Sequence, residues 1–277
     1  MINWFIEPLQ YSFILRALIA AVVVGIVGSV LGTYVILRGM AFFGDALAHT
    51  ILPGVVVAFL FGWPLAVGAL VMGLLTALGI GALSGQGMVK EDTAIGVIFA
   101  GAFALGVALL SASNTYTVDL AHFLFGNLLG VSVSDLWLSI ILGLIVLLAI
   151  FLFYKEFLVI SFDPVLATTL RLPANFLRYL LLVLIAVTIV VSLQVVGIAL
   201  MMAMLVTPAA SASLLTRRLP PMMAIAAVIG TFSSVSGLYA SYYFDIASGP
   251  AIVLVATLIF GFVFVFAPGR GIAWQKR

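Results

Sequence analysis

Long apolar segments recur along the whole chain, and they restrict it to one kind of fold. A helix needs about 20 residues, at ~1.5 Å of rise each, to cross the hydrocarbon core of a bilayer. Nine segments approach or exceed this length: Tyr11–Leu37, Ala41–Phe61, Leu65–Leu83, Ala94–Ser111, Ser134–Phe153, Phe176–Leu193, Val196–Leu215, Met222–Tyr243 and Gly249–Ala267. All nine are predicted to be helices, because lipid offers no partner for the backbone N–H and C=O groups of an open strand.

The sequence therefore predicts an all-α integral membrane protein with one domain over residues 1–277. This domain is a bundle of eight or nine transmembrane helices. The lower number is kept as an alternative because only a short interruption at Gln194 separates the sixth apolar segment from the seventh.

Composition excludes a water-soluble fold and several kinds of chemistry. Charged residues make up 7% of the 277 positions, whereas about a quarter of an ordinary soluble domain is charged. The chain has no cysteine, so disulfides and thiolate metal sites are excluded. It has no Gly-x-x-x-x-Gly-Lys-[Ser/Thr] loop to hold the phosphates of ATP. We expect no enzyme, no cofactor in this chain and, without a basic patch, no nucleic-acid partner.

The positive charges predict how the chain is oriented in the membrane, because cytoplasmic loops are enriched in lysine and arginine. In a nine-helix arrangement, alternate connections carry Arg38, Lys90, Lys155, Arg171, Arg217, Arg218, Arg270, Lys276 and Arg277. The other connections, around 62–64, 113–133 and 244–248, contain no lysine or arginine. We therefore predict a multi-pass protein of the cell membrane with a cytoplasmic C-terminus. Arg16, inside the first segment, does not fit this arrangement.

Asp45 and His49 are the most informative ionisable residues of an apolar segment. Four residues apart in a helix, their side chains lie on one face. Ionisable residues at membrane depth are costly unless they are paired or face water, and they often mark an ion pathway. A carboxylate oxygen and an imidazole nitrogen are ligands for Mn²⁺, Zn²⁺ or Fe²⁺. The spacing is equally compatible with a packing role, in which Asp45 pairs with His49 or with Arg38.

Pro53 lies one turn beyond this pair. A proline within a helix lacks the N–H that the carbonyl four residues earlier would accept, and its ring clashes with that carbonyl. We therefore expect the helix to break near Pro53 and to free carbonyl groups close to Asp45 and His49.

Residues 154–173 form the longest internal stretch with scattered charge. Asp163 followed by Pro164 is typical of a helix start, with aspartate as the N-cap and proline in the first turn. Pro173 is expected to end that helix. The sequence thus predicts a short amphipathic helix at about 162–172 on the cytoplasmic side. Such a helix either lies in the lipid interface or inserts into a groove of a cytoplasmic partner.

Two further polar groups have ordinary structural explanations. Residues 90–93, Lys-Glu-Asp-Thr, are typical of a turn followed by a helix start, where acids are favoured by the helix dipole. Asp119 and His122 in an outward loop could contact a metal, but a solvated pair is the more common arrangement.

The region 201–208 raises two other questions. Met201, Met202 and Met204 could bind a soft metal, although methionines more often fill a core. Thr207-Pro208 is predicted to kink its helix, and the freed backbone groups would then be available for gating.

Four separated stretches match the pattern of one protein family. They are Arg38–His49 with the Leu52-Pro53-Gly54 that follows, Glu91–Gly96, His122–Asn127 and Val196–Ala210. Because they span most of the chain in the family's order, the chain resembles the permease subunits of ATP-binding-cassette (ABC) importers for manganese, zinc or iron. The Leu-Pro-Gly after the aspartate–histidine pair favours manganese.

The resemblance implies partners and assigns roles. Such a permease forms a homodimer, works with two cytoplasmic ATPase subunits that bind ATP, and receives its metal from an extracytoplasmic metal-binding protein. In the family, the acid and the histidine at the positions of Asp45 and His49 are associated with the metal pathway. The helix that engages the ATPase corresponds to Glu156–Leu172 here. The expected coupling residues are Glu156, Phe162, Asp163 and Pro164.

Two other classes of function are kept as alternatives. One is a secondary metal transporter driven by protons, in which Asp45 and His49 form the proton relay. The other is an intramembrane enzyme, which the scarcity of polar groups within the apolar segments disfavours.

Overall fold

A computed structural model of the chain describes residues 7–85, 89–112, 128–268 and 271. Within these ranges the regular secondary structure is helical. The elements are η1 (Pro8–Gln10), α2 (Ser12–Leu37), α3 (Phe43–Thr50), α4 (Leu52–Leu60), α5 (Leu65–Gly85), α6 (Glu91–Ala112), η2 (Leu128–Gly130), α8 (Val133–Leu152), α9 (Tyr154–Phe162), α10 (Pro164–Thr169), α11 (Ala174–Val196), α12 (Ile198–Leu215), α13 (Leu219–Phe244) and α14 (Ser248–Phe266).

Nine helical stretches among the described residues are long and apolar enough to cross a membrane. Helices α3 and α4 count together as one of them, Phe43–Leu60. Each stretch coincides with one predicted apolar segment to within a few residues at either end. The predicted all-α membrane fold is therefore confirmed.

The interruption predicted near Pro53 lies at Ile51, between α3 and α4. Pro53 is the second residue of α4, a position that needs no N–H donor within the helix. The break is shallow, because Ile51 keeps helical dihedral angles of −71° and −16°. Asp45 and His49 thus belong to α3, a helix of 8 residues that ends just after the histidine.

The boundary between the sixth and seventh spans differs from the prediction. The break was expected at Gln194, but α11 continues to Val196 and α12 begins at Ile198. Gly197 separates them with a φ of 81°. Glycine adopts such angles at no steric cost, whereas glutamine is a good helix former. The glycine, rather than the polar residue, therefore ends α11.

The predicted helix at 162–172 is shorter than expected and follows a second short helix. Helix α9 ends at Phe162, and α10 runs only from Pro164 to Thr169. Arg171 adopts the left-handed conformation, with a φ of 56°, and the Leu172 amide donates back to the Ala167 carbonyl at 3.0 Å. Such a bond is typical of a left-handed helix ending, and it stops the helix before Pro173.

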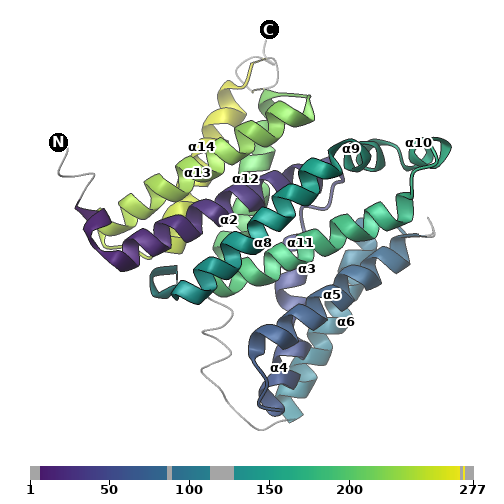
Figure 1. Cartoon of the computed structure of the whole chain (residues 1–277), viewed down its shortest axis with the longest axis horizontal. Coiled ribbons are helices and arrows are strands. Elements are labelled where there is room, and N and C mark those ends of the chain that lie inside the picture. The colour runs from purple at the N-terminus through teal and green to yellow at the C-terminus, as the bar shows by residue number, and fades with distance from the viewer. Residues whose placement is uncertain (1–6, 86–88, 113–127, 269–270, 272–277) are drawn as a thin grey trace. The chain divides into compact units, whose positions relative to one another are not determined.

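The helices form two compact units, each built from separate parts of the chain. The first comprises residues 1–36, 125–147 and 195–277, and the second comprises residues 37–124 and 148–194. In the first unit, α13 packs against both α12 and α14, and Figure 1 shows α2 alongside α13. The Ser234 hydroxyl of α13 donates to the Ala21 carbonyl of α2 at 2.9 Å.

Pro208 lies inside α12, which continues through it. Proline has no N–H to donate to the carbonyl four residues earlier, which belongs to Met204. The Ser29 hydroxyl of α2 donates to that carbonyl at 3.4 Å. The backbone group that Pro208 was expected to free therefore has a partner within the first unit.

The second unit contains the predicted site residues of α3. Helix α4 packs closely on α5, and both helices pack on α6. A side chain at Gly54 would overlap the backbone carbonyl of Gly68, and one at Gly68 would overlap that of Gly54. Glycine at both positions allows this close contact, as in other membrane helix pairs.

Candidate functional site

Asp45 and His49 meet on one face of α3, as their spacing predicts. The Nε2 atom of His49 lies 3.5 Å from Oδ1 of Asp45. The Asp45 side chain is 24% exposed and the His49 side chain is 37% exposed. The residues between them, Ala46, Leu47 and Ala48, are buried. Helix α3 thus packs through its apolar residues and leaves the carboxylate and the imidazole on its open side.

Aromatic residues of α6 hold the imidazole from the side. Phe99 and Phe103 each meet the His49 ring edge-to-face, with ring centroids 5.9 and 5.7 Å apart, respectively. Phe42, next to the start of α3, meets Phe99 in the same way at 6.0 Å. The phenyl rings restrict the imidazole without offering hydrogen-bond acceptors to its nitrogen atoms. His49 therefore keeps a nitrogen next to the Asp45 carboxylate.

At Asp45 and His49 the described residues offer a metal ion two potential ligands. Carboxylate oxygen and imidazole nitrogen are suitable ligands for divalent transition metals. No group of three or more His, Cys, Asp or Glu side chains comes together in the described ranges, whereas such a metal ordinarily takes about four or more ligands. The Asp45–His49 pair therefore offers two potential ligands, and a metal bound there would need further ligands from outside this part of the chain; this pair is called the half-site below.

Arg38 is bound to Glu91, so the proposed alternative in which Arg38 pairs with Asp45 is wrong. The Nη2 and Nε atoms of Arg38 donate to the two carboxylate oxygens of Glu91, the second bond measuring 3.2 Å. The side chains are only 7% and 19% exposed. Burial lowers the pKa of Arg38, Glu91 opposes this shift, and the charge of Arg178 adds to it.

This ion pair supports the half-site. Arg38 lies in the connection that leads into α3, and Glu91 is the first residue of α6. The pair therefore joins the connection before α3, the helix that carries Asp45 and His49, to the start of α6, the helix that carries Phe99 and Phe103. Sequence reasoning missed it, because Arg38 was explained as an orientation signal and Glu91 as part of a helix start.

Arg178 was also missed. It lies within α11, and its guanidinium donates to the carbonyl of Gly81 in α5. Neither residue carries a local signal of this contact, because they are 97 positions apart in the sequence. A charged residue inside an apolar segment was the only available indication.

The expected coupling residues lie on α9 and α10. Asp163 caps α10 as predicted, with its Oδ1 accepting the amide of Leu166 at 3.0 Å, and Pro164 begins that helix. Glu156 is half-buried in the first turn of α9. Phe162 is 63% exposed between the two helices.

The other candidates lie outside the described residues or are partly or fully buried. Asp119 and His122 lie outside the described residues. Met201 and Met204 are buried in the first unit, and Met202 is half-buried. Their burial agrees with the expected role of methionine in filling a core.

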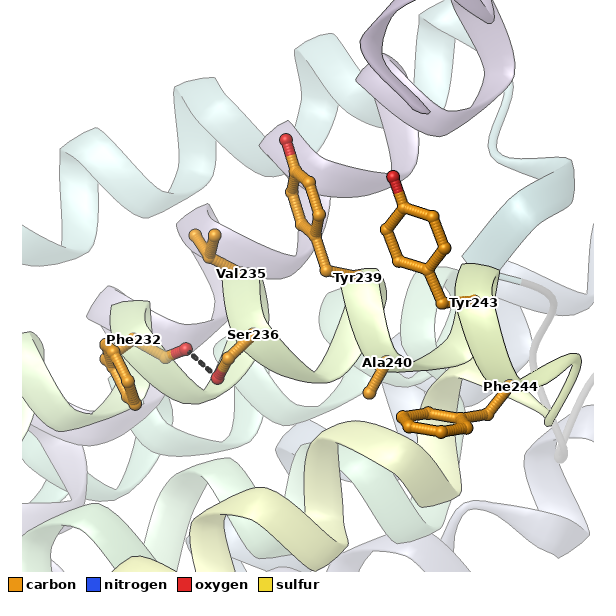
Figure 2. A pocket seen from close by; sticks show the side chains of 7 residues that line it. All are labelled: Phe232, Val235, Ser236, Tyr239, Ala240, Tyr243 and Phe244. Carbon is orange, nitrogen blue, oxygen red and sulfur yellow. Dashed lines mark hydrogen bonds between the residues drawn. The ribbon is translucent and has the colours of Figure 1, made fainter. Parts of the chain in front are cut away.

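An apolar groove of 540 Å³ runs along α13 in the first unit. Figure 2 shows Tyr239 and Tyr243 projecting in the same direction from this helix, with the small residues Ser236 and Ala240 on its flank. The described residues that line the groove include no carboxylate or imidazole. The groove therefore lacks the ligands that the half-site of α3 offers.

Comparisons with known proteins agree with a membrane transport role. A model of the ABC 3 transport family matches residues 10–267. The manganese transport system membrane protein MntC of Listeria monocytogenes is 49% identical over 274 residues, which cover 99% of this chain and 98% of that protein. The chelated iron transport system membrane protein YfeD of Yersinia pestis is 41% identical over 254 residues, covering 92% of this chain and 85% of that protein.

A solved structure extends this likeness to three dimensions. In PsaBC from Streptococcus pneumoniae in complex with Fab, one chain superposes with a TM-score of 0.84 and 41% identity, over 100% of both chains. The family match covers nearly the whole sequence, and the relatives share both length and fold with it. The chain therefore belongs to the ABC 3 transport family.

Proposed function

We propose that this chain is the membrane permease subunit of an ABC importer that carries a divalent transition metal ion into the cytoplasm, with Mn²⁺ as the favoured cargo. The observation that carries the proposal is the Asp45–His49 half-site on the open face of α3. The names of MntC and YfeD support manganese or iron as cargo. Carboxylate and imidazole suit Mn²⁺, Fe²⁺ and Zn²⁺ alike, so the relatives rather than the ligands favour manganese.

A second copy of the chain would complete the metal site. Two Asp45–His49 pairs facing each other offer four ligands to one ion. The surface of α6 supports such a dimer, because small residues recur every fourth position on its exposed side: Gly96, Ala100, Ala104 and Ala108. Rows of small residues let membrane helices approach closely. Phe99 and Phe103 flank this row and contact His49, so a dimer along α6 would bring the two half-sites near each other.

The proposed site would transfer the ion by replacing part of its water shell. The Asp45 carboxylate and the neutral His49 imidazole would donate lone pairs to the metal, and the phenyl rings of Phe99 and Phe103 would exclude water beside it. Transport also requires that the ion leave again, so the site should bind it only moderately tightly. A closed site with many carboxylates would hold the ion too strongly for passage.

Energy is proposed to come from separate cytoplasmic ATP-binding subunits. The segment that would engage them is α9 with α10, through Glu156, Phe162, Asp163 and Pro164. The exposed side chains of Phe162, Leu166 and Leu170 support this assignment, because apolar residues exposed between charged ones are typical of a protein contact. In the lipid interface, the same side chains would instead anchor the segment to the membrane.

The remaining partners follow from the proposed orientation. The C-terminus and the α9–α10 segment would lie in the cytoplasm, and the opposite side of the cell membrane would receive the ion from a metal-binding protein. The positive charges at Arg38, Lys90, Lys155 and Arg171 support this orientation.

ATP dependence of uptake tests the class of transporter. The chain would be reconstituted in proteoliposomes with its ATP-binding subunit and its metal-binding protein, and uptake of radioactive Mn²⁺ would be measured. We expect uptake to require hydrolysable ATP and to persist after a protonophore collapses the proton gradient. Uptake that is abolished by the protonophore and independent of ATP would instead support the proton-driven alternative. Competition by unlabelled Mn²⁺, Fe²⁺ and Zn²⁺ in the same assay ranks the cargo.

A further inference from the structure

A cavity of 630 Å³ in the second unit is lined partly by charged side chains, and neither Asp45 nor His49 is among its lining residues. Its wall includes the end of α5, the start of α6, the start of α11 and parts of α9 and α10. The charged and amide side chains that line it are Arg38, Lys90, Glu91, Asn175 and Arg178. Three cationic groups therefore share the cavity with one carboxylate.

Both arginines of this cavity have an N–H group that makes no hydrogen bond with the described residues. Two nitrogen atoms of Arg38 donate hydrogen bonds to Glu91, and Arg178 donates one to the Gly81 carbonyl. The remaining Nη1 of Arg38 and the Nε of Arg178 are buried and have no hydrogen-bond partner among the described residues. Lys90 is exposed at the edge of the cavity. Leaving buried donors unpaired is costly, so these groups favour an additional acceptor.

Helix ends add to the positive potential. Helix α6 begins at Glu91 and α11 begins at Ala174, and both first residues line the cavity. The N-terminus of a helix carries a partial positive charge and free N–H groups. The C-terminus of α5 would oppose this effect, but Arg178 donates to one of the carbonyls near that end. An anion is therefore the ligand that this cavity favours.

We propose that the cavity binds a phosphate group, supplied by the head group of an anionic lipid or by free phosphate. Phosphate suits arginine and lysine donors in particular, because its oxygens accept charge-assisted hydrogen bonds. Basic pockets between membrane helices on the cytoplasmic side are typical sites for anionic head groups. The cytoplasmic position rests on the orientation in the proposed function, whereas the anion chemistry rests only on the cavity.

An alternative explanation is that these cations only mark the cytoplasmic side of the membrane. Arg217 and Arg218 fit that explanation, because both are exposed. Arg38 does not, because its side chain is 7% exposed and lines a cavity. Ser161 and Thr168 of α9 and α10 also line this cavity. A bound phosphate would therefore link α5, α6 and α11 to the segment that is proposed to contact the ATP-binding subunit.

Lipid titration of the purified chain tests this site without any transport partner. The chain in a neutral detergent would be titrated with phosphatidylglycerol, with phosphatidylcholine or with inorganic phosphate. Thermal stability and lipid retention in native mass spectrometry are the two readouts. We expect phosphatidylglycerol to raise the melting temperature and to be retained, and phosphatidylcholine to do neither. An equal effect of inorganic phosphate would identify free phosphate as the source and would also support the site.

The variants Lys90→Gln and Lys90→Gln/Arg178→Gln should weaken this binding. Each cation near the membrane surface contributes about 1 kcal/mol to anionic lipid binding, so the double variant should lose roughly 30-fold in affinity. The matched control is Arg217→Gln/Arg218→Gln, which removes the same charge outside the cavity and should bind as the unchanged chain does.

Two results would overturn the proposal. One is equal phosphatidylglycerol binding by all three variants, and the other is equal stabilisation by phosphatidylcholine. Lys90→Gln alone keeps the test valid if the double variant does not fold, because Lys90 is exposed and its loss leaves the packing intact. Failure here leaves the ATP-dependent uptake of the proposed function unaffected, because the titration contains neither metal nor ATP.

Discussion

Ser29 of α2 donates a hydrogen bond to the carbonyl of Met204, the group that Pro208 leaves without its helical donor. Ser29 is fully buried. In the hydrocarbon core of a bilayer there is no water to donate a hydrogen bond to an unpaired carbonyl. One serine on a neighbouring helix therefore compensates for a proline within α12.

The variant Ser29→Ala should lower the free energy of unfolding by ~1 kcal/mol, because it leaves the Met204 carbonyl unpaired. Thermal or denaturant unfolding in detergent measures this loss. Ser236→Ala is the control, because Ser236 is only half-buried and its hydroxyl donates within its own helix, to the Phe232 carbonyl. The double variant Ser29→Ala/Pro208→Ala restores an N–H donor at position 208 and should recover part of the stability. A double variant that is no more stable than Ser29→Ala would contradict this explanation.

The Arg38–Glu91 pair should be essential for stability. Arg38→Ala would leave the Glu91 carboxylate in a largely buried position without its partner, at a cost of about 3 kcal/mol in the free energy of unfolding. The exchange Arg38→Glu/Glu91→Arg should recover part of that loss. Asp92→Ala, at the exposed neighbour of Glu91, should change stability by less than about 0.5 kcal/mol. If Arg38→Ala were as mild as Asp92→Ala, the pair would have no structural role.

The close contact of α4 with α5 predicts a sharp difference between two glycine substitutions. Gly68→Leu places a side chain where the Gly54 carbonyl lies, so it should lower the free energy of unfolding by about 1–3 kcal/mol. Gly261→Ala in α14 meets no atom within 4 Å and should raise stability slightly, since alanine favours helix more than glycine does. Unfolding of the two variants in the same detergent provides the comparison. Equal effects of the two substitutions would argue against a tight contact between α4 and α5.

Replacing Arg171 by glycine should stabilise the protein. It holds a φ of 56° at the end of α10, a conformation that costs an L-residue about 1 kcal/mol and glycine almost nothing. Arg171→Gly should therefore raise the melting temperature of the isolated chain. Arg217→Gly, at an exposed arginine without a positive φ, should lower it or leave it unchanged. A lower melting temperature for Arg171→Gly would indicate that the arginine side chain makes a stabilising contact.

The fold followed from sequence where local rules decide it. Span lengths depend on runs of apolar residues, and the Asp45–His49 contact depends on a spacing of four within one helix. The Asp163 cap is likewise set by neighbouring residues. All three are local properties, so the sequence alone predicts them.

The contacts that the sequence did not reveal join residues far apart in the chain. Arg38 and Glu91 are 53 positions apart, Arg178 and Gly81 are 97 apart, and Ser29 and Met204 are 175 apart. Such pairs depend on which helix faces pack together. The helices are apolar nearly all round, so their residue patterns do not specify a packing face. The sequence offered two indications of where helices pack: glycines that allow close contact, and prolines that leave a carbonyl without its helical donor.

The central claim is that Asp45 and His49 are the metal ligands of a permease. Its most direct test is ATP-driven uptake of radioactive Mn²⁺ by proteoliposomes that contain the assembled transporter with Asp45→Ala/His49→Ala, compared with Asp92→Ala as the control. We predict that the double variant takes up no more Mn²⁺ than vesicles without ATP, while it still assembles with its ATP-binding subunit, and that the control transports normally. Uptake by the double variant at the rate of the unchanged chain would contradict the claim.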